Sequence, residues 1–190
     1  MPIEQREREI PQLASIHTVA FDFDGVFTNN KVWVDQEGRE SVRCDRSDGL
    51  AMDLVRAFQR NGRLTAEFFI LSREHNPVVL ARAQKLRLAC HQAVGDKLSF
   101  VQQYLAARFP NQSDVFAGFV YVGNDLNDLP VMRRAGYAVA PADAHPMVLA
   151  VAHLVLSQSG GEGFVRAFVE RLLRVGDLSV DEIEDLILSC

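Results

Sequence analysis

The sequence predicts a doubly wound α/β fold, Rossmann-like, in which helices flank a parallel sheet. Three short apolar runs, at residues 18–21, 66–71 and 118–122, have the length and composition of buried strands. Amphipathic stretches lie between them, and alternating strands and helices are typical of a parallel sheet. Polar residues occur directly after each run or within a few positions of its end. The carboxyl ends of parallel strands are where such folds bind ligands, so we expect a site there.

The size and charge of the chain limit the function classes. A chain of 190 residues can form one domain with a full core, so we expect a single domain over residues 1–190. The net charge of -5 disfavours a partner that is a nucleic acid or a membrane surface. No apolar run approaches the ~18 residues that span a membrane. Cys44, Cys90 and Cys190 lack metal-binding spacing, which indicates free thiols and a cytoplasmic protein.

Local signals place the remaining elements along the chain. Residues 1–15 form a charged N-terminal extension, and alternation around a Gly-containing loop predicts a β-hairpin flap over residues 31–43. A Ser-Asp-Gly lead followed by helically spaced apolar residues predicts a helix over about residues 47–60. We expect further helices at 77–86, from about 97, at 164–173 and at 180–188 in the C-terminal segment 175–190, and weaker strands at 137–140 and 154–156.

Two carboxylates directly follow the first strand. Alternation places the side chains of Asp22 and Asp24 on the same side. Two charges this close repel each other unless a cation or a shared proton relieves the repulsion, and Mg²⁺ with oxygen ligands is the simplest relief. An acidic turn after an edge strand remains the alternative for this pair alone.

Further polar groups at the other strand ends make the pattern more specific. They are Ser72 after the second run, Asn124, Asp125 and Asp128 after the third, and Lys97 between these two runs. A carboxylate can accept a phosphoryl group covalently, and a second one can act as general acid and base. Magnesium, lysine and hydroxyl groups neutralise and orient phosphoryl oxygens. The set therefore predicts phosphoryl transfer, with three unrelated polar turns as the alternative.

These residues resemble the four motifs of the haloacid dehalogenase (HAD) superfamily of aspartate-nucleophile phosphatases. The first motif matches residues 22–28, the second Ser72, the third Lys97 and the fourth residues 123–128. The resemblance extends from about residue 19 to residue 173. Within the superfamily, the chain is similar to the capless phosphatases of keto-deoxy-octulosonate 8-phosphate and keto-deoxy-nonulosonate 9-phosphate. It also resembles the C-terminal domain of some acylneuraminate cytidylyltransferases.

The resemblance implies catalytic roles. Asp22 would be the nucleophile and Asp24 the general acid and base. Ser72 would hydrogen-bond a phosphoryl oxygen, and Lys97 would hold the nucleophile and the phosphoryl charge.

The resemblance also implies a Mg²⁺ cofactor. Its ligands would be Asp22, the backbone carbonyl of Asp24, and Asn124, with Asp125 acting through water or as a direct ligand. Asn124 stands where these phosphatases usually carry Asp. An amide oxygen can bind magnesium but brings less charge, so this departure would weaken metal binding.

Six residues near the motifs are candidates for substrate contacts: Thr28, Arg46, Arg73, Glu74, Asp128 and Glu162. Glu74 and Glu162 stand where octulosonate enzymes tend to carry Arg. They therefore favour a nonulosonate substrate, with ordinary surface charges as the alternative.

The capless phosphatases that the chain resembles have no cap domain and form tetramers. We therefore expect a homotetramer in which the hairpin flap closes a neighbour's site, with Trp33 and Val34 near the subunit contact. The Gly-rich residues 160–163 would be a mobile cover, or an ordinary lead into a helix. The implied function is Mg²⁺-dependent hydrolysis of a phosphorylated keto-deoxy sugar acid through an aspartyl-phosphate. The alternative is a weakly active or non-catalytic oligomerisation module.

Overall fold

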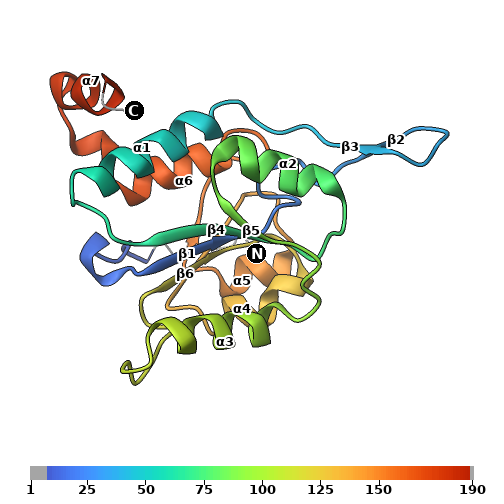
Figure 1. Ribbon diagram of the computed structural model, residues 1–190, viewed down its shortest axis with the longest axis horizontal. Coiled ribbons are helices and arrows are strands. Elements are labelled where there is room, and N and C mark those ends of the chain that lie inside the picture. The colour runs from blue at the N-terminus through green and yellow to red at the C-terminus, as the bar shows by residue number, and fades with distance from the viewer. Residues whose placement is uncertain (1–7, 189–190) are drawn as a thin grey trace.

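In the computed structural model, which describes residues 8–188, a six-stranded parallel sheet forms the centre of the chain (Figure 1). The strand order is β5-β4-β1-β6-β7-β8, so β1 lies between β4 and β6. The strands are β1 (Thr18–Phe21), β4 (Glu67–Leu71), β5 (Ala89–His91), β6 (Phe119–Val122), β7 (Tyr137–Ala140) and β8 (Leu154–Val155). The predicted doubly wound α/β fold is therefore confirmed.

Helices cover both faces of the sheet (Figure 1). One face carries α1 (Asp48–Arg60), α2 (Pro77–Leu86) and α6 (Phe164–Leu172), and the other carries α3 (Lys97–Arg108), α4 (Leu129–Met132) and α5 (Pro146–Val151). The last helix, α7 (Val180–Leu188), packs beside α1. Three single turns of 3-10 helix complete the order: η1 (Leu13–Ser15), η2 (Leu126–Asp128) and η3 (Val175–Asp177). Within residues 8–188, no helix has both the length and the apolar character needed to cross a bilayer.

Alternation along β1 explains why there is a core on each face. The ring of Phe21 lies 5.4 Å from that of Phe27 and 5.9 Å from that of Phe168, in the core under α1 and α6. Ala20 belongs to the opposite core, with Tyr121 of β6. All four residues of β1 are buried, as expected for a strand with helices on both faces.

Capping residues define where α2 and α3 begin. Asn76 Oδ1 accepts a hydrogen bond of 3.0 Å from the Val78 N–H, and Pro77 occupies the first helical position. Asp96 Oδ1 accepts one of 3.0 Å from the Ser99 N–H. The second cap sets the start of α3, whose first residue is Lys97.

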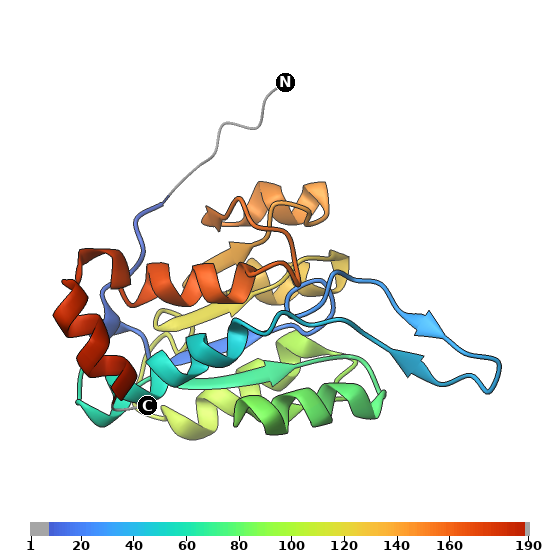
Figure 2. The same cartoon turned by 90° about the horizontal axis from the view of Figure 1, so that it is seen from above.

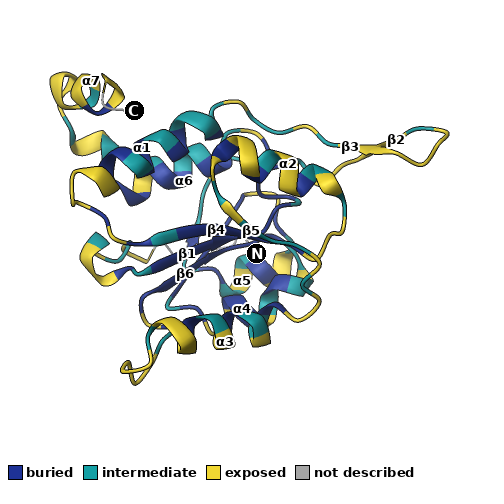
Figure 3. Cartoon of the chain, viewed as in Figure 1, coloured by how far each residue is buried: buried dark blue, intermediate teal, exposed yellow. Residues whose placement is uncertain are grey.

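A small hairpin extends from the carboxyl edge of the sheet, at the opposite end of the molecule from α7 (Figure 2). Its strands β2 (Trp33–Val34) and β3 (Glu40–Ser41) pair antiparallel and are exposed (Figure 3). The predicted hairpin over residues 31–43 is present, with shorter strands. Between β1 and α1 it is the only sheet, so no cap domain is inserted there.

Two elements differ from the sequence-based expectation. The strand β5 was not predicted, because Ala89-Cys90-His91 is short and lacks an apolar pattern; its pairing with β4 makes it a strand. The last helix, predicted over residues 180–188 of the C-terminal segment 175–190, is present as α7, but the turn η3 before it was not predicted, and residues 189–190 lie outside the described part. Of the predicted extension over residues 1–15, the described residues 8–15 contain only η1.

Candidate active site

The strand order brings three loop starts to one edge. β1 pairs with both neighbours in register, so that Phe21 stands opposite Ile70 of β4 and Val122 of β6. A pocket of about 360 Å³, here the strand-end pocket, opens at this edge. It is lined by predicted site residues from the loops after β1 (Asp22, Asp24), β4 (Ser72, Arg73, Glu74) and β6 (Asn124, Asp125). The sheet therefore gathers residues that are far apart in sequence.

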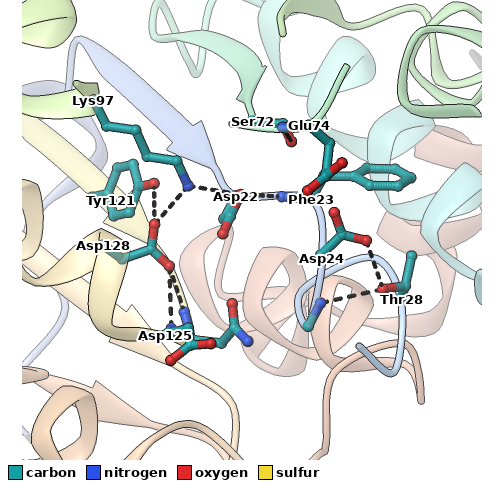
Figure 4. Close-up of polar contacts among 12 residues, drawn as sticks. Asp22, Phe23, Asp24, Thr28, Ser72, Glu74, Lys97, Tyr121, Asp125 and Asp128 are labelled. Atoms are coloured by element: carbon teal, nitrogen blue, oxygen red, sulfur yellow. Dashed lines mark hydrogen bonds and ion pairs between the residues drawn. The ribbon is translucent and has the colours of Figure 1, made fainter. Parts of the chain in front are cut away.

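A buried network, here the catalytic cradle, surrounds the first carboxylate (Figure 4). It consists of Asp22, Lys97, Tyr121 and Asp128. Lys97 Nζ lies 2.8 Å from Asp22 Oδ1 and 2.7 Å from Asp128 Oδ1. The Tyr121 hydroxyl donates to the same Asp128 oxygen over 2.7 Å. Lys97 is thus held between two carboxylates, and Asp128 is itself fixed by a second donor.

The cradle perturbs the ionisation of its members. Although burial alone lowers the pKa of Lys97, the charges of Asp22 and Asp128 raise it, so Lys97 is an ammonium group at neutral pH. Burial, aided by the charge of Asp128, raises the pKa of Asp22 to about 8, while Lys97 opposes the rise. A further positive charge beside Asp22 would favour its ionised, nucleophilic form.

The second carboxylate sits in a tight loop. Gly25 has φ +75°, and its N–H donates to Thr28 Oγ1 over 3.2 Å. The Thr28 hydroxyl in turn lies 3.5 Å from Asp24 Oδ1, to which it donates. Burial and then the charge of Glu74 raise the pKa of Asp24. A carboxyl with raised proton affinity beside a nucleophile suits a general acid.

Ser72 and Arg73 complete the polar lining opposite Asp24. Ser72 is buried, and its Oγ accepts a hydrogen bond of 3.0 Å from the Glu74 N–H. Its hydroxyl hydrogen can therefore be donated to an oxygen of a ligand. Arg73 adds a permanent positive charge to the pocket.

The site fits a hard divalent cation, although not through carboxylates alone. Asn124 Oδ1 is buried without a hydrogen-bond partner, and Asn124 lines the same pocket as Asp22. A Cβ on Gly25 would come within 1.9 Å of Asn124 Nδ2, so glycine is required there. No group of three or more His, Cys, Asp or Glu residues suited to a metal occurs within residues 8–188. A cation here would need the Asn124 oxygen and a backbone carbonyl besides Asp22.

Two residues predicted to contact the substrate, Asp128 and Thr28, do not line the strand-end pocket, and their side chains are buried and hydrogen-bonded inside the protein. Asp128 is 0% exposed; besides its cradle contacts, its Oδ2 accepts from the N–H groups of Asn124 (2.9 Å) and Asp125 (3.3 Å). It therefore orients the loop after β6. Thr28 is also fully buried and braces the Asp24 loop, accepting from the Asn30 N–H over 3.2 Å.

Two other predicted contacts lie outside the strand-end pocket. Glu162 forms an ion pair with Arg43 at the base of the hairpin, and Arg46 is exposed. Neither residue lines the pocket.

The glycines of residues 160–163 pack against the nucleophile loop. The Gly161 N–H donates to the Val26 carbonyl over 3.1 Å, and a Cβ on Gly160 would lie 2.0 Å from the Gly25 carbonyl oxygen. The Gly160 N–H also donates to Asp143 Oδ1 over 2.9 Å. The segment thus supports the Asp24 loop from the side, and it leads directly into α6, as the alternative of an ordinary helix lead expects.

Sequence reasoning missed Tyr121 and Asn30. Tyr121 was counted only as part of a strand, although a phenol in an otherwise apolar run was an available signal. Asn30 lines the pocket and has φ +60°, a conformation that Asn tolerates better than most residues. Nothing in the sequence distinguished Asn30 from a hairpin lead.

Known proteins are similar to the chain over most of its length. No family model matches it. A protein of Streptomyces avermitilis described as a HAD family hydrolase is 35% identical, with 86% of this chain and 94% of that chain covered and a TM-score of 0.75. The 3-deoxy-D-manno-octulosonate 8-phosphate phosphatase of Yersinia pestis is 29% identical over 171 residues, which is 88% of this chain and 85% of that protein.

A third relative has been solved with a metal. The cobalt-bound deoxy-D-mannose-octulosonate 8-phosphate phosphatase of Haemophilus influenzae is 25% identical, covers 86% of this chain and 91% of its own, and has a TM-score of 0.73. The shared fold, the 35% identity over nearly the whole Streptomyces protein and the phosphatase relatives agree with the motifs at the strand ends. The chain therefore belongs to the haloacid dehalogenase (HAD) superfamily of phosphatases.

Proposed function

We propose that this protein is a Mg²⁺-dependent phosphomonoester hydrolase that works through an aspartyl-phosphate on Asp22. The observation that carries the proposal is the position of Asp22, buried at the end of β1 but lining an open pocket, with Lys97 Nζ at 2.8 Å. A carboxylate so placed can reach a phosphorus atom in the pocket while its charge stays compensated.

The reaction divides into two displacements. In the first, Asp22 forms a bond to phosphorus, the ester bond breaks, and Asp24 gives its proton to the leaving oxygen. In the second, Asp24 takes a proton from water as that water attacks phosphorus, and inorganic phosphate leaves Asp22. Lys97 and the Ser72 hydroxyl hold phosphoryl oxygens during both steps.

Asp22, the backbone carbonyl of Asp24 and Asn124 Oδ1 would hold the magnesium ion, with Asp125 assisting through water. The unpartnered Asn124 oxygen supports this assignment, as does the cobalt-bound form of the Haemophilus relative. When bound, the ion supplies positive charge to the phosphoryl oxygens and to Asp22. Asp125 Oδ1 accepts from the Leu126 N–H over 2.7 Å and caps η2, which favours the indirect role.

The proposed substrate is a phosphorylated keto-deoxy sugar acid. The names of the Yersinia and Haemophilus relatives favour the octulosonate 8-phosphate. A nonulosonate phosphate is the second candidate, because Glu74, which stands where octulosonate enzymes tend to carry Arg, lies in the pocket wall. A non-catalytic module is not favoured, because the four proposed catalytic residues, Asp22, Asp24, Ser72 and Lys97, lie together.

We also propose a homotetramer in the cytoplasm. The hairpin exposes Trp33 and Val34 at 60% each, and an exposed aromatic residue of this kind is typical of a subunit contact. Cys44 and Cys90 are free thiols, in keeping with a reducing compartment.

A phosphate-release assay tests the function. Purified protein with Mg²⁺ should release phosphate from one of the two sugar acid phosphates, and removal of the metal with EDTA should stop the reaction. Asp22→Asn should lower turnover by at least about 10³-fold while leaving the fold intact, since it removes the nucleophile. Retention of wild-type turnover by Asp22→Asn would refute the covalent mechanism.

A further inference from the structure

A second pocket of about 260 Å³, here the leaving-group pocket, adjoins the strand-end pocket. The two share Asp24, Asn30 and Glu74 in their walls. Because Asp24 is the proposed proton donor to the leaving oxygen, the carbon chain attached to that oxygen would extend past Asp24 into this second space.

The walls of the leaving-group pocket carry negative charge and hydrogen-bonding amides. Its carboxylates are those of Asp24, Glu40 and Glu74, and its amides are those of Asn30 and Asn76. The rest of the lining is apolar and consists of Val32, Val42, Val78 and Val79. Among the described residues that line it, there is no lysine, arginine or histidine. Such walls can accept and donate hydrogen bonds to hydroxyl groups, but they repel an anion.

Glu40 is the carboxylate that the hairpin contributes, and a hydrogen bond fixes it. Asn76 Nδ2 donates to Glu40 Oε2 over 2.7 Å, while Asn76 Oδ1 caps α2 through the Val78 N–H. One asparagine thus ties the hairpin strand β3 to the start of α2. The Glu40 charge is therefore held at the wall of the pocket.

The neighbouring positive charge serves the other pocket. Arg73 lines the strand-end pocket and not the leaving-group pocket. The strand-end pocket also carries four carboxylates, those of Asp22, Asp24, Glu74 and Asp125. A phosphoryl group there would be held by Arg73, by Lys97 beside Asp22 and by the proposed Mg²⁺, whereas a second anion close behind it meets Glu40 and Glu74 with no cation in the wall. The positive groups thus lie only at the phosphate end of the cleft.

We propose that Glu40, with Glu74, makes the enzyme select phosphate esters whose first few carbons beyond the ester oxygen are hydroxylated and uncharged. The inference rests on the proposed function, because it needs the phosphate at Asp22. A sugar acid 8-phosphate meets this rule, since its carboxylate is at the far end of the carbon chain from the phosphate. A three-carbon ester with a carboxylate does not.

A matched pair of ligands tests the selection by binding, without turnover. Glycerol 3-phosphate and 3-phosphoglycerate differ mainly in a carboxylate that replaces a hydroxymethyl group. Their dissociation constants would be measured by calorimetry with Mg²⁺ on the full-length Asp22→Asn protein. We expect glycerol 3-phosphate to bind about tenfold more tightly.

Adding Glu40→Gln to that protein should reduce the preference about threefold, and Glu74→Gln should do the same. Glutamine can still accept the hydrogen bond from Asn76, so the wall keeps its shape. Glu37→Gln removes the same charge from the hairpin turn, where Glu37 pairs with Arg39 and lines neither pocket, and should leave the preference unchanged.

Three results would overturn the inference: equal or tighter binding of 3-phosphoglycerate, a preference untouched by both pocket substitutions, or no binding of glycerol 3-phosphate. The proposed function is judged separately, by phosphate release from the sugar acid phosphates with wild-type protein. The inference can therefore fail while the phosphatase activity stands.

Discussion

The two sides of the cleft are built in different ways. In the catalytic cradle, Asp22, Lys97 and Asp128 are 5%, 2% and 0% exposed and are joined by short contacts. On the opposite side, the hairpin exposes Trp33 at 60%, and Glu40 is tied to α2 through Asn76. The sheet fixes the chemistry before a substrate arrives, whereas the hairpin side depends on few contacts. Changes in the cradle should therefore alter turnover, and changes in the hairpin should alter selection and assembly.

Among changes that leave the proposed catalytic residues in place, the largest effect is expected for a single hydroxyl in the cradle. Tyr121→Phe removes one donor from Asp128 Oδ1, so that oxygen attracts Lys97 more strongly and draws it from Asp22. We expect kcat to fall about tenfold with KM within about twofold, because substrate binding is not altered. Steady-state phosphate release measures both constants.

A matched control is available on α3. Tyr104→Phe also removes one hydrogen bond to a carboxylate, here that of Glu67, at 2.9 Å and outside the strand-end pocket. It should leave kcat unchanged. An equal kcat in the two variants would mean that Tyr121 has no positioning role.

The next effect concerns the hairpin. If Trp33 lies at a subunit contact, Trp33→Asp should lower the mass seen by light scattering and reduce sugar acid phosphate turnover about fivefold. The turnover of p-nitrophenyl phosphate should change less, because this smaller substrate contacts fewer residues of the cleft. Val180→Asp places the same charge on exposed α7 and serves as the control. A wild-type protein that is monomeric at micromolar concentration with full activity would exclude this account of the hairpin.

A smaller effect is expected at the proposed metal position. Asn124→Asp adds a negative charge to the ligand set, so the Mg²⁺ concentration for half-maximal activity should fall about threefold. Titration of activity with Mg²⁺ measures this. An unchanged half-saturation, together with loss of activity in Asp125→Ala, would transfer the ligand role to Asp125.

The smallest effect is expected on stability rather than activity, at Asp48, where the chain leaves the hairpin and begins α1. Arg82 Nη2 donates to the Asp45 carbonyl over 2.5 Å and lies 3.4 Å from Asp48 Oδ2, and burial raises the pKa of Asp48 to about 7. Because the folded state binds this proton more tightly than the unfolded state, the Asp48 contribution to stability falls as pH rises from about 4 to 7.

In the Asp48→Asn variant this side chain cannot ionise, so its contribution to stability does not fall as pH rises. The unfolding temperature of the variant relative to wild type should therefore rise by about 5 °C between pH 4 and pH 7. Calorimetric unfolding of both proteins across that range checks the prediction. Parallel curves would show that Asp48 keeps its ordinary pKa.

The parallel sheet and the edge at which the site lies could be predicted from the sequence, because both follow from the direction of the strands. The strands β1, β4 and β6 are apolar runs, and parallel pairing then requires that Asp22, Ser72 and Asn124 meet at one edge. The fold and the gathering of the site could therefore be predicted before the structure.

The remainder depends on tertiary contacts that leave no local signal. From the sequence, the carboxylate of Asp128 is a plausible ligand for a substrate or metal. Only the structure shows that it is buried against Tyr121 and holds other residues of the site in place. Gly160 belongs to a flexible-looking segment, yet its contact with the Gly25 carbonyl is long-range. Glu40 became relevant only when its hydrogen bond to Asn76 placed it at a pocket.

The central claim is that Asp22 carries the phosphoryl group, and a chemical trap tests it most directly. Asp24→Asn protein, which lacks the general base for the second step, would be mixed with substrate and Mg²⁺, quenched in acid and reduced with borohydride. Reduction of an acyl phosphate converts aspartate to homoserine, which peptide mass spectrometry can locate. The account predicts homoserine at position 22, and only when substrate was present. Homoserine at another position would contradict it, and so would its absence from position 22 in a variant that releases one equivalent of the dephosphorylated sugar acid per site.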